Sequence, residues 1–179
     1  MTASLVGQIS AVRVDSVNWR TTSTLEMTVR AHGADTTFVI PAGYLTDFAS
    51  VPRITAWLIP RTGDYTPAAV AHDWLLSDAL ADKKITSCEV DDAFREIMRS
   101  LGVPWARRWL MWAGVRWAAV LSPLRRPGWL RDLPMVLLVS LCALPFVLPG
   151  VIGVGVSLIL ILIFSLFAPR EQKVNSLRT

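Results

Sequence analysis

Polar and apolar side chains alternate along residues 4–45 with a period of two. The alternation is clearest over 22–30, and a Gly-Ala-Asp turn at 33–35 separates it from a short further run at 37–41. This pattern, with β-branched residues and a glycine-containing turn, is typical of half-buried antiparallel strands. It therefore predicts a small N-terminal antiparallel β-meander.

Beyond residue 65 the apolar positions follow the period of a helix. Thr66 and Pro67 are typical of an N-cap and a first helical residue, and they predict a helix over 66–81. Thr86 and Glu89 form a capping-box pattern that predicts the start of a second helix. Its predicted buried stripe consists of Val90, Phe94, Ile97, Met98 and Leu101. The short connection between the two helices favours an antiparallel pair.

A third helix is predicted from Trp105 to about Leu121, after a Gly-Val-Pro break at 102–104. Arginines separate its tryptophans, which are Trp105, Trp109, Trp112 and Trp117. Two interpretations remain open for this helix. Either it is a core helix that packs on the first two, or one of its faces lies in the bilayer interface, where tryptophan is common.

The longest apolar stretch covers 133–168 and contains no charged residue. One straight helix over these residues would be roughly 54 Å long, whereas the bilayer core is about 30 Å thick. Pro149 and Gly150 form a turn signal in the middle of the stretch. We therefore predict a transmembrane helical hairpin of two short spans. The alternative is a re-entrant dip or a single span centred on 151–168.

These patterns divide the chain into four parts and predict an α+β fold with a membrane tail. An α+β domain over 1–122 contains the β-meander and a three-helix region. A basic juxtamembrane linker follows at 123–132, then the membrane segment at 133–168 and a basic tail at 169–179.

Composition and charge agree with a membrane protein. Apolar residues make up 53% of the chain and charged residues 18%, which excludes disorder, collagen and coiled coil. The basic residues of 101–179, Arg116 and Arg125 among them, flank the apolar stretch, which favours a cytoplasmic position for both flanks. No nucleic-acid motif accompanies them, so no nucleic acid is expected as a partner. No signal peptide is recognisable over 1–20. The two cysteines, Cys88 and Cys142, are not expected to form a disulfide.

The candidate chemistry lies in the adjacent pair His72 and Asp73, together with Asp91 of the second helix and Asp47. If the two helices are antiparallel, Asp91 faces His72 and fixes its tautomer, so that His72 accepts a proton. Asp73, alone or with His72, is then a candidate ligand for one divalent metal ion. Two further polar residues of the turn after Asp47 are Ser50 and Arg53. The alternative is that Asp47 caps its own turn, Asp73 faces solvent and His72 is packed alone.

Three motifs in order resemble the domain of unknown function 1353 family of tailed phages and prophages. The run 41–53 is similar to its Pro-x-Gly-aromatic-x-Thr-Asp-Phe signature, and 68–75 to its Ala-Ala-x-x-His-Asp-x-Leu motif. The run 90–98 is similar to its third motif, with Val90 in place of alanine, and Trp74 replaces a tyrosine of the second motif. The resemblance covers about 36–118. It implies a phage or prophage protein with other phage proteins as partners, and the membrane tail lies outside it. The apolar stretch and its basic flanks add the bacterial inner membrane as the expected location, with the domain in the cytoplasm.

A second similarity is to secreted phospholipases A2, which place His-Asp on one helix and a further Asp on an antiparallel helix. That resemblance implies a hydrolase centre of His72, Asp73 and Asp91, although the disulfides and the calcium loop of those enzymes are missing here. Two functions therefore stay open. The first is a membrane-held hydrolase, with or without a metal ion, with Asp47 beside its centre. The second is a non-enzymatic phage membrane or assembly protein whose polar cluster is structural.

Overall fold

The structure is a computed structural model that describes residues 3–15, 18–47 and 63–167. Strands come first and helices afterwards, which confirms the predicted α+β class. The strands are β1 (Ala3–Val6), β2 (Ala11–Arg13), β3 (Trp19–Thr21), β4 (Leu25–Ala31), β5 (Ala34–Ile40) and β6 (Leu45–Thr46). The helices are α1 (Thr66–Trp74), η2 (Leu75–Ala79), α2 (Ser87–Ser100), α3 (Trp105–Val120) and α4 (Trp129–Phe167).

The strands form two antiparallel sheets, in the orders β1-β4-β5 and β2-β3-β6, so the predicted single meander is wrong. Gly7 follows β1 with a φ of 114°, a backbone conformation that favours glycine, and the chain leaves the first sheet there. In the hairpin of β4 and β5, Ala31 pairs with Ala34. Its two-residue turn is therefore His32 and Gly33, both with positive φ.

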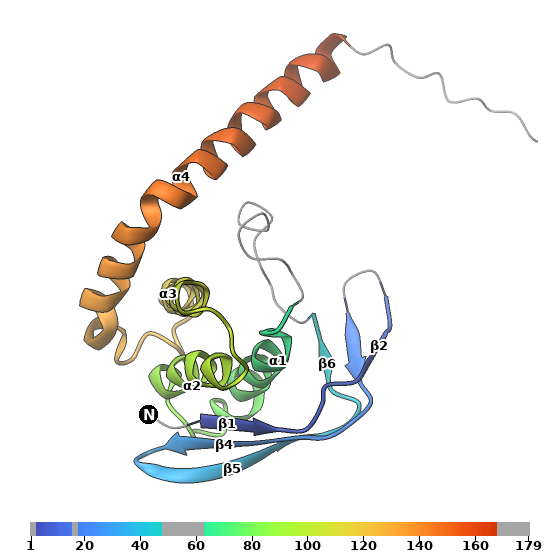
Figure 1. Cartoon of the computed structure of the whole chain (residues 1–179), viewed down its shortest axis with the longest axis vertical. Coiled ribbons are helices and arrows are strands. Elements are labelled where there is room, and N and C mark those ends of the chain that lie inside the picture. Colours follow the sequence, from blue (N-terminus) through green and yellow to red (C-terminus); the bar gives the residue numbers. More distant parts are fainter. Residues whose placement is uncertain (1–2, 16–17, 48–62, 168–179) are drawn as a thin grey trace, which may run out of the picture.

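The helices lie in layers over one face of the first sheet (Figure 1). Helices α1 and α2 pack together next to the sheet, α3 packs on α2, and the first part of α4 packs on α3. The sheet contributes alternate residues to the core: Leu25, Met27, Val29, Ala31, Phe38 and Ile40. The helices contribute, among others, Val70, Leu75, Val90, Phe94, Ile97 and Met98. The core therefore holds α1 and α2 at fixed positions over the sheet.

The helix starts agree with the sequence in one case and differ in the other. Thr86 accepts a hydrogen bond from the Glu89 amide, and the Glu89 side chain accepts one from the Thr86 amide, so the predicted capping box is confirmed. Helix α1 instead has Tyr65 as its N-cap. The Thr66 hydroxyl accepts a hydrogen bond from the Gly63 amide and does not cap the helix. The segment predicted over 66–81 is helical as far as Ala79, and it changes to π-helix at Leu75.

Helix α4 is one continuous helix, and the predicted turn at Pro149 and Gly150 is not formed. Inside an apolar stretch a helix satisfies its own backbone groups, so an interior proline is tolerated at the loss of one hydrogen bond. Val136, near the start of α4, is buried against Trp112 and Ala113 of α3. The rest of the helix extends away from the domain (Figure 1).

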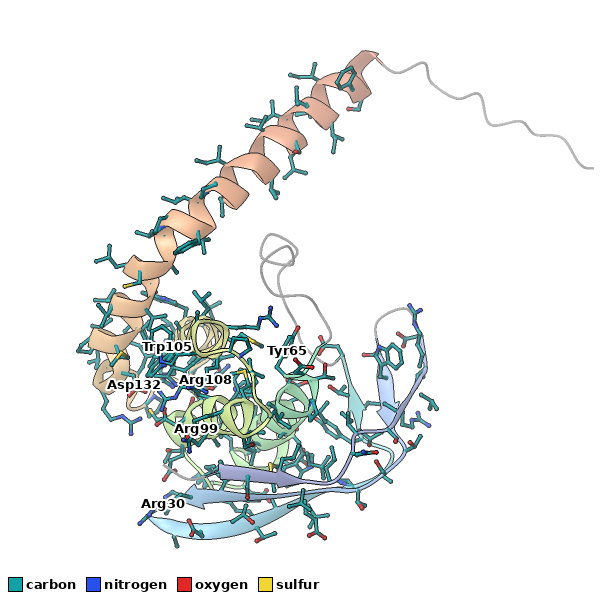
Figure 2. The ribbon with its side chains drawn as sticks, in the orientation of Figure 1. Arg30, Tyr65, Arg99, Trp105, Arg108 and Asp132 are labelled. Atoms are coloured by element: carbon teal, nitrogen blue, oxygen red, sulfur yellow. The ribbon has the colours of Figure 1, made fainter. Side chains whose placement is uncertain are left out.

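Helix α3 combines features of both interpretations given above. Trp112 and Arg116 are buried, as in a core helix, whereas Trp105 and Trp117 are 67% and 43% exposed. Trp105 and Arg108 are labelled in Figure 2 on this helix, which lies beside the first part of α4.

Candidate functional site

The predicted pairing of His72 with Asp91 is present. His72 Nε2 donates a hydrogen bond to Asp91 Oδ1 at 2.7 Å, from α1 to α2. Both side chains are buried, and the Phe94 ring lies against the imidazole with 4.8 Å between ring centroids. With its proton on Nε2, the imidazole keeps Nδ1 as its basic nitrogen.

Two arginines also bind the Asp91 carboxylate. Arg116 Nη1, on α3, lies 2.9 Å from Asp91 Oδ2. Arg125, in the segment between α3 and α4, places Nη2 2.9 Å from Oδ1 and 3.2 Å from Oδ2, and the same nitrogen donates to the Val115 carbonyl. Asp91 therefore joins three helices and the segment that leads to α4.

Arg116 extends this cluster to α4. Its Nε lies 3.1 Å from Asp132 Oδ2, at an ion-pair distance but without the geometry of a directed hydrogen bond. Its Nη2 donates to the Cys88 sulfur at 3.4 Å. Burial by itself would raise the pKa of Asp91, but the contact with His72 and the charges of Arg125 and Arg116 outweigh it and lower that pKa.

Asp73 and Asp47 lie together in a different place, an open depression of about 440 Å³. It is lined by Asn18, Tyr44, Leu45, Thr46, Asp47, Asp73, Leu76 and Ser77. The Thr46 hydroxyl donates to Asp73 Oδ2 at 3.0 Å. Burial raises the pKa of Asp73, and the charge of Asp47 acts in the same direction, whereas His72 and Thr46 oppose the rise. His72 and Asp73 are adjacent on α1, so the buried cluster lies next to this depression.

The depression also contains a polar chain on its helical side. The Tyr44 hydroxyl lies 3.2 Å from Ser77 Oγ, and the Ser77 hydroxyl lies 2.6 Å from Asp78 Oδ2. Burial raises the pKa of Tyr44, and the nearby carboxylates act in the same direction. At neutral pH this phenol is therefore a neutral hydrogen-bonding group at the edge of an acidic surface.

The structure divides the predicted site residues into three groups. His72 and Asp91 are in direct contact, Asp47 and Asp73 share the adjacent depression, and Ser50 and Arg53 lie outside the described residues. Sequence reasoning attributed Arg116 and Arg125 to membrane flanking and missed their place in the site. The burial of Arg116 could have been predicted from helical spacing, because it lies on the same face of α3 as Trp112 and Ala119, which are buried. No sequence pattern predicted the position of Arg125, because it lies in the segment between α3 and α4.

At the buried cluster, the groups that could bind a metal already have hydrogen-bond partners among the described residues. Both Asp91 oxygens already accept hydrogen bonds from arginine, and Nε2 of His72 is bound to Asp91. Within residues 3–15, 18–47 and 63–167, no three His, Cys, Asp or Glu side chains converge as metal ligands. Asp47 and Asp73 supply oxygen ligands of the kind a hard cation takes. Binding of a divalent metal ion at Asp73 remains a prediction.

Comparison with known proteins identifies the domain but gives it no activity. No curated protein and no solved structure matches the chain. A family model described as protein of unknown function, DUF1353, matches residues 22–115. The matched region contains His72, Asp73, Asp91 and Asp47, and it ends just before Arg116. Since that region is more than half of the chain, the protein belongs to the DUF1353 family.

Proposed function

We propose that this protein is a membrane-anchored phage or prophage member of its family, which holds the domain at the cytoplasmic face of the bacterial inner membrane. The main support for this proposal is the apolar surface of α4. Residues 129–165 form a helix whose most apolar 18-residue window has a mean hydropathy of 2.7, and none of that window is buried. In water so large an exposed apolar surface would be unfavourable, whereas a bilayer would cover it.

The anchoring proposal treats α4 as a single span, because the helix is continuous. At about 1.5 Å per residue, its 39 residues extend roughly 58 Å, about twice the bilayer core. The first part packs on α3, so the span corresponds to the later part of the helix. More basic residues precede the apolar stretch than follow it, which favours the domain on the cytoplasmic side.

Membrane anchoring is tested by cysteine labelling in cells that carry the full chain. Cys142 is replaced by alanine, and a cysteine is placed at Lys84 or at Asn175; Cys88 is buried and serves as the unlabelled background. We expect Lys84→Cys to react only after permeabilisation and Asn175→Cys to react from outside. Labelling of both only from inside would restore the hairpin. Release of the protein from membranes by alkaline carbonate would refute anchoring altogether.

In this proposal the cluster around Asp91 is a structural connection between the domain and the membrane helix. Two observations support this role. Asp91 binds Arg116 and Arg125 as well as His72. Arg116 also pairs with Asp132 at the start of α4. Such a network fixes the orientation of α3 and of the segment before α4. The function supported best is accordingly non-enzymatic: the domain presents its surface to other phage proteins at the membrane.

A hydrolase is the second candidate, and the position of His72 beside Asp73 favours it. A histidine oriented by Asp91, next to a depression lined by Asp47 and Asp73, has the arrangement of a general base near a polar substrate. Its substrate would be a lipid, a peptidoglycan precursor or a peptide.

The two candidates differ in what Asp73→Asn does. A hydrolase would turn over at least one of the three substrate classes, and Asp73→Asn would lower that turnover about a hundredfold or more without unfolding the protein. Asp82→Asn is the matched control, since Asp82 is exposed and lies outside the depression. For a structural cluster we expect no turnover by the wild type and normal phage or prophage phenotypes with Asp73→Asn.

A further inference from the structure

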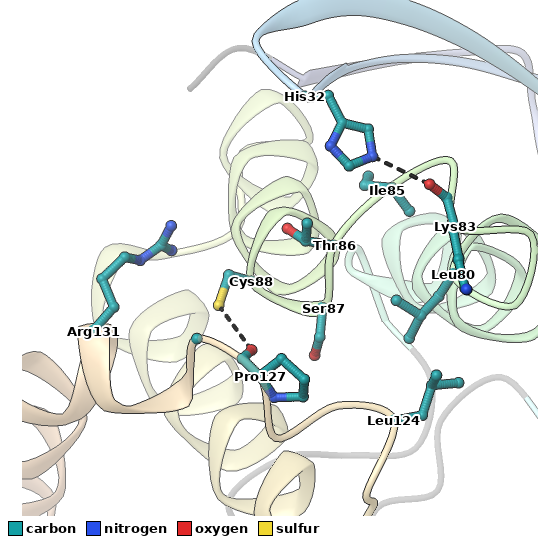
Figure 3. A pocket seen from close by; sticks show the side chains of 11 residues that line it. His32, Leu80, Lys83, Ile85, Thr86, Ser87, Cys88, Leu124, Pro127 and Arg131 are labelled. Atoms are coloured by element: carbon teal, nitrogen blue, oxygen red, sulfur yellow. Dashed lines mark hydrogen bonds between the residues drawn. The ribbon is translucent and has the colours of Figure 1, made fainter.

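A second cavity borders the buried cluster through Cys88, but neither His72 nor Asp91 lines it. It has a volume of about 430 Å³ and lies between the start of α2 and the segment that leads to α4 (Figure 3). Its lining consists of His32, Leu80, Lys83, Ile85, Thr86, Ser87, Cys88, Leu124, Pro127, Gly128 and Arg131.

Ser87 is a buried polar residue with no partner in this cavity. It is the first residue of the 14-residue helix α2 and is 3% exposed. Among the described residues its hydroxyl has no hydrogen-bond partner. Figure 3 shows this hydroxyl directed into the space above Pro127 and Leu124. A buried hydroxyl without a partner is unfavourable, and a ligand that accepts its hydrogen bond would remove the penalty.

The electrostatic environment of Ser87 selects a negatively charged group. The amides of the first helical turn carry partial positive charge, and a phosphate or carboxylate is stabilised there. Lys83 also lines the cavity, and within the described part of the chain it has no ion-pair partner. In Figure 3 its ammonium lies at the edge of the cavity, with the Leu80 side chain between it and Ser87 in this view.

The other charged groups near this end of α2 are already paired. Arg131 binds Asp92 and Asp132. The Glu89 carboxylate accepts hydrogen bonds from the amides of Thr86 and His32 and from the Thr86 hydroxyl. The charge of Lys83 is therefore the one available to a ligand.

Two backbone positions at the cavity are held in an unusual conformation. Lys83 and His32 both have positive φ, 57° and 50°, and His32 Nε2 lies 3.2 Å from the Lys83 carbonyl oxygen. Residues other than glycine adopt this conformation only where surrounding contacts fix it. The contact fixes the backbone from which the Lys83 side chain extends, so its position is prepared before a ligand arrives.

Four apolar residues, Leu80, Ile85, Leu124 and Pro127, also line the cavity. A free inorganic anion would leave this surface uncovered. We propose that the cavity binds a phosphate ester, with the phosphate between Lys83 and Ser87 at the start of α2 and the apolar part of the ester against these four residues. The phosphate belongs either to a lipid headgroup or to a soluble ester, since the chemistry recognised is the same.

The test uses the full chain in micelles of dodecyl maltoside, a detergent without phosphate, titrated with phenyl phosphate and separately with inorganic phosphate, and followed by phosphorus NMR. We expect phenyl phosphate to saturate the site and to bind more tightly than inorganic phosphate. Lys83→Gln and Ser87→Ala should each weaken binding roughly tenfold or more, because each removes a hydrogen bond to a charged group. Lys83→Arg should retain binding.

Lys84→Gln is the matched control, since Lys84 is adjacent, lies outside the cavity lining and pairs with Asp82. It should change the affinity less than twofold. Addition of phosphatidylglycerol to these micelles distinguishes the two sources: competition with phenyl phosphate supports the site and assigns it to a lipid headgroup, and no competition supports a soluble ester. Absence of saturable binding would overturn the proposal. Wild-type affinity for phenyl phosphate in Lys83→Gln or in Ser87→Ala would also overturn it.

Discussion

Replacing Asp91 by asparagine tests whether the buried cluster holds the domain together. The side chain keeps its shape but loses the charge that balances Arg116 and Arg125. Arg116 is fully buried, and the Arg125 side chain is 13% exposed, so water cannot solvate both guanidinium groups in place of the carboxylate. An amide also presents N–H donors to arginines that have no acceptor to offer.

The expected magnitude follows from the burial of this network. Removal of one partner from a buried ion pair destabilises a protein by about 3–5 kcal/mol, because the remaining charge is left uncompensated. Domains of ordinary size are stable by about 5–15 kcal/mol. Asp91→Asn should therefore remove a large fraction of the free energy of unfolding. The double variant with Arg116→Met should lose less than the sum of the two single changes, because each single change leaves the other group unpaired.

The assay is denaturant unfolding of the full chain in detergent, followed by tryptophan fluorescence. Asp82→Asn is the control, since Asp82 and its partner Lys84 are both about 60% exposed; it should change stability by less than about 1 kcal/mol. The pKa of Asp91 is lowered, so its stabilisation is present above an unfolded pKa of about 3.9 and is lost as pH falls through the folded value. Asp91→Asn should flatten this acid-side loss. A change under about 1 kcal/mol, or additive behaviour with Arg116→Met, would refute the reasoning.

Three further changes test other parts of the structure with the same unfolding measurement. Asp73→Asn should stabilise the protein at neutral pH. The pKa of Asp73 is raised in the folded state, so the protein loses stability as pH rises through that pKa, whereas asparagine stays neutral. A loss of stability at pH 7 would contradict this. Val136→Ala should destabilise by about 2 kcal/mol, and Leu137→Ala, 49% exposed, should have little effect; equal effects would argue against packing of α4 on α3. Gly128→Ala should destabilise by about 1–3 kcal/mol, since its φ is 76° and the new Cβ would lie 2.9 Å from the Cys88 sulfur; wild-type stability would contradict that geometry.

The sequence predicted those features that depend on short-range pattern. The capping box at Thr86 and the helix from Trp105 were predictable because a few neighbouring residues determine them. The pairing of His72 with Asp91 followed from placing both residues on an antiparallel helix pair. The division into two sheets was not predictable, because strand partners are chosen by contacts far apart in the sequence.

Two incorrect predictions concern α3 and α4, and each has its own physical reason. Pro149 and Gly150 favour a turn in water, but in an apolar stretch a broken helix would leave backbone groups unsatisfied, and the helix continues through them. Arg116 was assigned to membrane topology because a sequence does not show which of several arginines is buried. Its role became visible only when α3 placed it against Asp91.

The packing of Val136 on α3 has a consequence for how the protein can be divided. The folding unit does not end where the family match ends at residue 115, nor where the uncharged stretch begins at 133. A water-soluble fragment that ends before Asp132 would lose a counter-ion of Arg116 and uncover Trp112. A fragment long enough to keep both would carry the first turns of an apolar helix. No clean cut separates the domain from α4, and a graft of α4 onto another protein would have to bring α3 with it.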